Sequence, residues 1–97
     1  MLKVLEDLVL LARERKAKPI EGSYTNKLLK DKTLVKEKVI EEINELIEAI
    51  NENSNKIHEA ADVFYHLVVM LEAYDIKMED VVAELKKKTK VKFRRQL

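Results

Sequence analysis

The stretch EEINELIEAINENSNKIHEAAD (residues 41–62) joins two runs of helical spacing through a short polar break, ENSN. Before the break, Ile43, Leu46 and Ile50 recur at the spacing of one helix face. The asparagines and the serine of the break are residues that readily cap a following helix. Because helices joined by so short a link are antiparallel neighbours, the stretch predicts two helices packed side by side in opposite directions.

The rest of the chain extends this pattern to an all-α protein. With one glycine, Gly22, and one proline, Pro19, the composition is typical of a helical bundle. Ser23 or Thr25 can cap a short helix, and Thr33 can cap the long helix after it. We predict a single domain over residues 1–97, an antiparallel bundle of four to five helices with a basic tail at about 89–97. The helices are expected at about residues 2–16, 26–30, 33–51, 56–74 and 79–89.

The helix expected at about 56–74 is apolar on nearly all sides in its second half. Five apolar residues follow one another there, Leu67, Val68, Val69, Met70 and Leu71. A helix of this kind is central in a fold, and a chain of 97 residues has little core material to cover it. We therefore expect a second subunit to complete the bundle in a homodimer. The alternative is a monomer with a crowded core.

Composition also excludes several classes of protein. The chain has no cysteine, which excludes disulfides, zinc–thiolate sites, iron–sulfur clusters and thiol catalysis. No apolar run reaches membrane-spanning length, and the N-terminus lacks the pattern of a signal peptide. We expect a soluble cytoplasmic protein with no membrane partner.

Four acidic residues lie on a strip that is bordered by apolar positions. Glu42 and Glu45 are about 60° apart on one helix, and Glu59 and Asp62 are about 60° apart on the next. Carboxylates beside buried residues repel one another and lose hydration, so they become protonated or bind a cation. Oxygen-only ligation suits Mg²⁺, and it also suits Mn²⁺. The strip therefore predicts a Mg²⁺ site, with Mn²⁺ as a possible substitute.

Two other interpretations of the acidic residues compete with a Mg²⁺ site. A di-iron bundle needs Glu-x-x-His on two helices, and the spacings here are Glu-x-x-Glu and Glu-x-x-Asp. Alternatively, acids on these helices are ordinary surface residues with lysine partners, an interpretation that we accept for Glu48 and Glu52. We expect His58 to lie at the surface.

Several further motifs accompany this strip. They are GSYT (22–25), KLL (27–29), KV (38–39), EE (41–42), EAADV (59–63), YHL (65–67) and MEDV (78–81). The acidic pattern resembles the all-α nucleoside triphosphate pyrophosphohydrolases, the MazG-type group. Within that group, residues 5–88 resemble phosphoribosyl-ATP pyrophosphohydrolase. Three features depart from the pattern. Ile40 stands where glycine is usual, the turn after KLL lacks its usual glycine and is a residue shorter, and Lys77 stands where serine often caps the last helix.

The resemblance implies hydrolysis of phosphoribosyl-ATP between the α and β phosphates, which gives phosphoribosyl-AMP and pyrophosphate in the second step of histidine biosynthesis. Mg²⁺ held by the four acids would neutralise the triphosphate and orient a water. Glu41, or one of the ligands Glu42 and Glu45 with a pKa raised by crowding, would accept the proton of that water. The substrate-binding candidates are Arg15, Lys27 and Lys38 for phosphate, Ser23, Tyr24 and Thr25 for phosphate or ribose hydroxyls, and His66 through Asp62.

Three other functions remain open at this point. One is a house-cleaning enzyme that hydrolyses other nucleoside triphosphates. Another is a helical nucleic-acid-binding protein that uses KKKTKVKFRR (86–95), although the dense acids and the lack of a recognition motif make nucleic acid an improbable partner. The third is a non-enzymatic dimerisation bundle, which would leave the acidic strip unexplained.

Overall fold

The computed structural model describes the backbone of residues 1–95 and the side chains of residues 1–89. Within residues 1–95 every regular element is a helix, which confirms the all-α prediction. The elements are α1 (Lys3–Ala17), α2 (Tyr24–Lys30), α3 (Lys32–Glu52), α4 (Lys56–Ala73) and α5 (Met78–Arg95). None of these helices combines the length and the apolar character that a membrane span requires.

Polar side chains cap the N-termini of two helices, α2 and α3. Ser23 caps α2, as predicted, by accepting a hydrogen bond from the backbone N–H of Asn26. The cap of α3 is Asp31 and not Thr33, because the Asp31 carboxylate accepts from the N–H of Leu34 at 3.0 Å and so starts the helix earlier. An aspartate is the better acceptor at this place, since it satisfies a free N–H and lies at the positive end of the helix.

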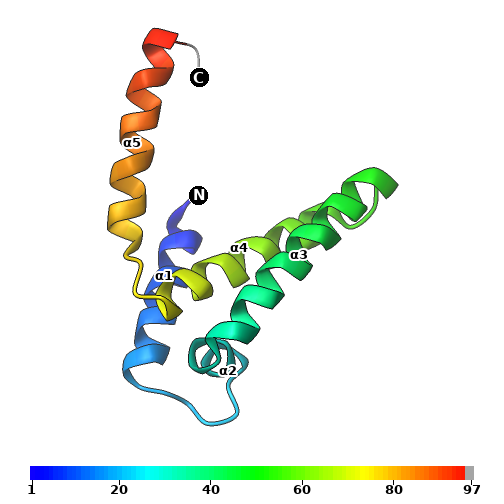
Figure 1. Ribbon diagram of the computed structural model, residues 1–97, viewed down its shortest axis with the longest axis vertical. Helices are drawn as coiled ribbons and strands as arrows, with labels where there is room; N and C mark the ends of the chain where they lie inside the picture. The colour runs from blue at the N-terminus through cyan, green and yellow to red at the C-terminus, as the bar shows by residue number, and fades with distance from the viewer. Residues whose placement is uncertain (96–97) are drawn as a thin grey trace.

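The core lies where α2, α3 and α4 meet. Leu28 and Leu29 of α2 pack with Val35 of α3 and with Val69 and Ala73 of α4. Figure 1 shows α3 and α4 side by side and α2 at the base of the pair. The turn between them, residues 53–55, reverses the chain and makes the two long helices antiparallel, as the sequence predicts.

The apolar second half of α4 is covered within the chain, contrary to our expectation. Val68 and Val69 are buried, and their apolar neighbours are half-buried, because the other helices pack around this segment. Exposed apolar side chains lie on every long helix among the described residues. Those on α3 and the first half of α4 are Ile40, Ile43, Ile47 and Ile50, together with Ile57 and Phe64, and others lie on α1 (Val4, Leu5 and Leu10) and on α5 (Val82 and Leu85).

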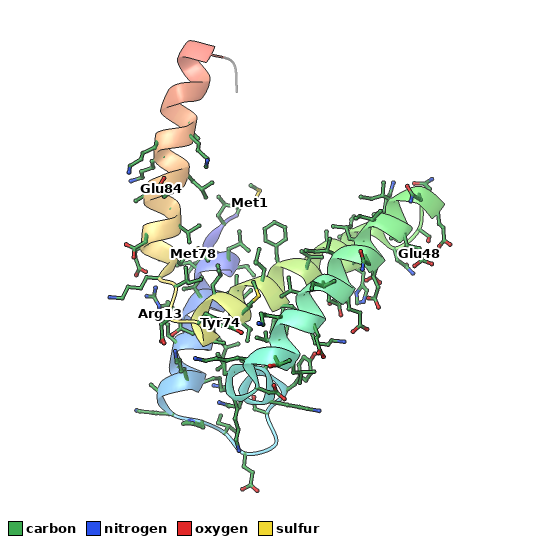
Figure 2. All side chains as sticks on the ribbon, in the orientation of Figure 1. Met1, Arg13, Glu48, Tyr74, Met78 and Glu84 are labelled. Carbon is green, nitrogen blue, oxygen red and sulfur yellow. The ribbon has the colours of Figure 1, made fainter. Side chains whose placement is uncertain are left out.

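Helix α5 extends through most of the basic tail, to Arg95, instead of ending near residue 89 as expected. In Figure 1 it rises from the end of α4 and points away from the α3–α4 pair. Two ion pairs join α1 to the start of α5 and to the turn before it, Arg13 with Glu79 and Lys16 with Asp75 respectively (Figure 2 labels Arg13). We call these four residues the α1–α5 junction. The alternative of nucleic-acid binding concerns residues 86–95, whose side chains from residue 90 onward lie outside the described ones.

Candidate functional site

Three of the predicted metal ligands converge between α3 and α4. Each of Glu42, Glu45 and Glu59 offers a carboxylate oxygen, and these three atoms lie within 4.8 Å of one another. The arrangement follows from the fold, because residues three apart share a helix face and the antiparallel pair brings the two faces together. We call these three residues the carboxylate cluster.

Asp62, the fourth predicted ligand, lies outside the carboxylate cluster. It belongs to a second group of possible ligands, with Glu59 and His58, whose ligand atoms also lie within 4.8 Å of one another. The His58 Nε2 atom is 3.3 Å from the Asp62 carboxylate. Glu59 is therefore common to two overlapping groups. His58 lies at the surface, as predicted, with its side chain 72% exposed. Its spacing of four residues from Asp62 on the same helix brings the two side chains together.

The carboxylate cluster is short of hydrogen bonds. Glu42 is only 6% exposed. Within the described residues, one buried oxygen of Glu42 and one of Glu59 have no hydrogen-bond partner. Burial raises the pKa of Glu42, and the neighbouring Glu45 carboxylate raises it further. The pKa of Glu59 is raised by the same two causes in the same order. Free oxygens on crowded carboxylates are the ligands that a hard divalent cation takes, so the residues fit the predicted metal.

Glu41 lies outside both groups of possible ligands. Its carboxylate accepts a hydrogen bond from the Lys38 ammonium at 3.1 Å, and that contact is the main cause of the raised pKa of Lys38. The same ammonium is 3.8 Å from Glu42. Lys38 is thus the predicted phosphate-binding residue that lies directly against the carboxylate cluster.

His66 contacts Asp62 through the backbone and not through the carboxylate. The ring is 5% exposed, and its Nδ1 atom is 2.7 Å from the Asp62 carbonyl oxygen. Because a carbonyl only accepts, Nδ1 carries the hydrogen and Nε2 is left as an acceptor. The Tyr24 hydroxyl, 3.0 Å away, therefore donates to Nε2. His66 thus joins the first residue of α2 to the helix that carries Glu59 and Asp62.

The loop before α2 is fixed by Asn26, a residue that the sequence interpretation missed. Its side-chain oxygen accepts from the N–H of Ile20 at 2.9 Å, and its amide nitrogen donates to the carbonyl of Arg15 at 2.7 Å. Gly22 turns the loop at φ +81°, a backbone conformation that side chains disfavour. Only the position of Asn26 next to the predicted loop motif could have drawn attention to it.

The remaining predicted substrate-binding residues differ in what they contact. The Thr25 hydroxyl is hydrogen-bonded to the Tyr65 hydroxyl at 2.5 Å, which secures α2 to α4. Lys27 is exposed and lines a surface pocket beside the loop. Among the described side chains, no ion pair joins Arg15 or Lys27 to the carboxylate cluster.

The all-α fold and the carboxylate cluster are compatible with the class that the sequence predicts, the all-α pyrophosphohydrolases. The family model described as phosphoribosyl-ATP pyrophosphohydrolase matches residues 5–89. The chain therefore belongs to the phosphoribosyl-ATP pyrophosphohydrolase family, a family of hydrolases, as its motifs indicated.

Individual relatives agree with this assignment. The chain is 39% identical over 92 residues to the phosphoribosyl-ATP pyrophosphatase of Methanococcoides burtonii, with 90% of this chain and 93% of that protein covered. It is 42% identical over 91 residues to the enzyme of the same name from Clostridium acetobutylicum, covering 89% and 81%. It also matches the histidine biosynthesis bifunctional protein HisIE of Pyrococcus furiosus at 38% identity over 90 residues, covering 92% of this chain and 43% of that protein.

Proposed function

We propose that the protein hydrolyses phosphoribosyl-ATP between its α and β phosphates, giving phosphoribosyl-AMP and pyrophosphate, in the second step of histidine biosynthesis in the cytoplasm. Membership of the family supports this substrate. The observation that carries the chemistry is the pair of buried carboxylate oxygens, on Glu42 and Glu59, that lack a hydrogen-bond partner in the described residues. A triphosphate substrate binds a divalent cation, and carboxylate oxygens of this kind are ligands for the same cation.

In this proposal Glu42, Glu45, Glu59 and Asp62 hold Mg²⁺, for which Mn²⁺ can substitute. When bound, the metal supplies neutralisation of phosphate charge and orientation of the attacking water. Glu59 belongs to both groups of ligand atoms and so links the α3 acids to Asp62. The His58 ring supports Asp62 from the solvent side, since its Nε2 lies 3.3 Å from the carboxylate.

Lys38 and Glu41 are proposed to act together. In the structure the Lys38 ammonium lies against both Glu41 and Glu42. An incoming phosphate competes for the ammonium, and Lys38 then leaves Glu41 to bind the phosphate. The Glu41 carboxylate that is released in this way can accept the proton of the attacking water. Arg15 and Lys27 are proposed to bind phosphates that lie farther from the cluster.

We also propose that the enzyme is a homodimer, joined through α3 and the first half of α4. The exposed isoleucines at positions 40, 43, 47 and 50 follow the alternating three- and four-residue spacing of a helix-packing seam. Ile57 and Phe64 add to the exposed apolar surface on α4. Two copies that meet through these surfaces would complete a four-helix arrangement.

The dimer is tested by measuring the mass in solution with light scattering. Ile47→Glu places a charge in the proposed interface, so the wild type should have the mass of a dimer and the variant that of a monomer. Ile76→Glu is the matched control, because Ile76 is also exposed but lies in the turn before α5. A wild type that is monomeric at working concentration would contradict the dimer.

The activity is tested by measuring pyrophosphate release with Mg²⁺ and with EDTA. The substrates are phosphoribosyl-ATP and a panel of ordinary and deoxy nucleoside triphosphates. The proposal predicts metal-dependent turnover with a strong preference for phosphoribosyl-ATP. Turnover of the panel instead would indicate a house-cleaning enzyme, and no turnover of any substrate would reject the activity.

A further inference from the structure

Tyr24 presents an aromatic ring at the edge of the carboxylate cluster. Tyr24 is 46% exposed. Its hydroxyl lies 3.0 Å from Nε2 of His66, and Nδ1 of the same ring lies 2.7 Å from the Asp62 carbonyl oxygen, so Tyr24 lies beside the part of α4 that carries Glu59 and Asp62. Yet the hydroxyl already donates to the buried His66 ring. What Tyr24 can still offer a ligand is chiefly its exposed ring surface.

The ring is held in place from behind. Tyr65 lies nearly parallel to it, with ring centres 6.3 Å apart and an angle of 17° between the planes. The His66 ring stands edge-on to both tyrosines, at 5.8 Å from Tyr24 and 5.0 Å from Tyr65. Two buried leucines of α2, Leu28 and Leu29, anchor the helix that Tyr24 begins. An aromatic side chain fixed in this way loses little conformational entropy when a flat ligand stacks on it.

A pocket of about 640 Å³ adjoins Tyr24 on the side of the loop. Pro19 and Ile20 contribute apolar surface to its lining, and Lys27 and Lys30 contribute positive charge. Apolar surface next to basic groups is the combination that a nucleotide requires, because a nucleotide has a flat base and anionic phosphates.

We infer that Tyr24 is the surface on which the purine base of the bound nucleotide stacks, with the loop pocket receiving the part of the ligand beyond the base. The inference rests on the proposed binding of the phosphates at the carboxylate cluster. It gives Tyr24 a role through its ring, whereas the sequence suggested a role through its hydroxyl.

The test measures equilibrium binding of AMP and of inorganic pyrophosphate by calorimetry, in Mg²⁺, to the full-length protein. Three proteins are compared: the wild type, Tyr24→Phe, which keeps the ring, and Tyr24→Leu, which removes it. We expect Tyr24→Leu to raise the Kd of AMP by about tenfold or more. The Kd of pyrophosphate should not change, which also shows that the variant is folded. Tyr24→Phe should stay within about twofold of the wild type for both ligands.

Three results would overturn the inference. They are an AMP affinity that Tyr24→Leu leaves unchanged, an equal loss for AMP and pyrophosphate, and a loss in Tyr24→Phe as large as in Tyr24→Leu. Failure of the wild type to bind AMP would overturn it as well. Because AMP is bound and not hydrolysed, the result is separate from the assay of activity. A protein that binds AMP through the Tyr24 ring but does not hydrolyse phosphoribosyl-ATP would reject the proposed function and leave this inference standing.

Discussion

Acidic side chains in two regions of this protein differ in the partners that the fold gives them. At the α1–α5 junction, Asp75 is paired with Lys16, and Glu79 with Arg13. These contacts lower the pKa of both acids. In the carboxylate cluster, burial and the neighbouring acid raise the pKa of Glu42 and of Glu59. The acids of the α1–α5 junction are thus each paired with a basic side chain. The carboxylate cluster has too few basic partners for its three acids.

Structural and functional acids in this chain are separated by whether the fold pairs them with a cation. A paired carboxylate stabilises the fold by itself, whereas crowded carboxylates with free buried oxygens destabilise it until a cation arrives. The Lys38 ammonium, 3.8 Å from the Glu42 carboxylate, partly compensates its charge. The same ammonium lies closer to the Glu41 carboxylate, at 3.1 Å. The cluster is therefore best explained by a ligand that the protein does not itself contain.

The largest expected effect comes from Glu45→Gln. Removing one ligand of the cluster should lower the turnover of phosphoribosyl-ATP by about 1000-fold, since a bound metal contributes several kcal/mol and 1.36 kcal/mol is a factor of ten. Glu48→Gln is the matched control, because Glu48 is an exposed acid on the same helix (Figure 2). It should leave turnover within about twofold of the wild type. An equal loss of turnover in Glu45→Gln and Glu48→Gln would contradict the claim that the cluster acids act in catalysis and the surface acids do not.

An intermediate effect is expected on the pH dependence of stability without metal. Glu42 has a folded pKa above its ordinary value of 4.5. Between 4.5 and the raised pKa the folded state binds more protons than the unfolded state, so this group lowers the free energy of unfolding as pH rises. Glu42→Gln should therefore gain stability relative to the wild type as pH increases from 4.5, measured by urea unfolding in EDTA. A difference between the two proteins that is constant with pH, or that shrinks, would contradict this.

The smallest effect is expected at the α1–α5 junction, with Glu79→Gln. The lowered pKa of Glu79 means that its pairing stabilises the fold above an ordinary pKa of 4.5, and that this contribution is lost as pH falls through the folded pKa. Because the pair is exposed, the variant should unfold within about 2 °C of the wild type at neutral pH and low salt, with no difference at roughly 1 M salt. Activity should be unchanged. A loss of activity comparable with that of Glu45→Gln would place the junction in the site.

Much of the fold and part of the site could be predicted from the sequence. The 3.6-residue period located the helices, and the short ENSN link specified the antiparallel α3–α4 pair. Given that pair, the spacing of Glu42, Glu45 and Glu59 was enough to predict that their carboxylates meet. These features depend on regular backbone geometry, which a sequence pattern encodes directly.

The features that escaped prediction depend on tertiary contacts. Asn26 matters because a loop folds back against the end of α1, and no period reports such a contact. The His66 ring is hydrogen-bonded to the backbone carbonyl of Asp62 and not to the Asp62 carboxylate. Which of the two oxygens it contacts depends on the local helix geometry. The isoleucines of α3 form the same sequence pattern whether they are covered by this chain or by a second copy, so their exposure could not be inferred.

The most direct test of the account is thermal unfolding of the wild type, Glu42→Gln and Glu79→Gln, each with EDTA and with Mg²⁺. We predict that Mg²⁺ at about 100 times its Kd raises the Tm of the wild type and of Glu79→Gln by roughly 10–20 °C, since binding at that ratio contributes about 2.7 kcal/mol. The Tm of Glu42→Gln should not respond to Mg²⁺. A wild type indifferent to millimolar Mg²⁺ and Mn²⁺, or a Glu42→Gln variant that responds as fully as the wild type, would contradict the claim that the carboxylate cluster is a metal site.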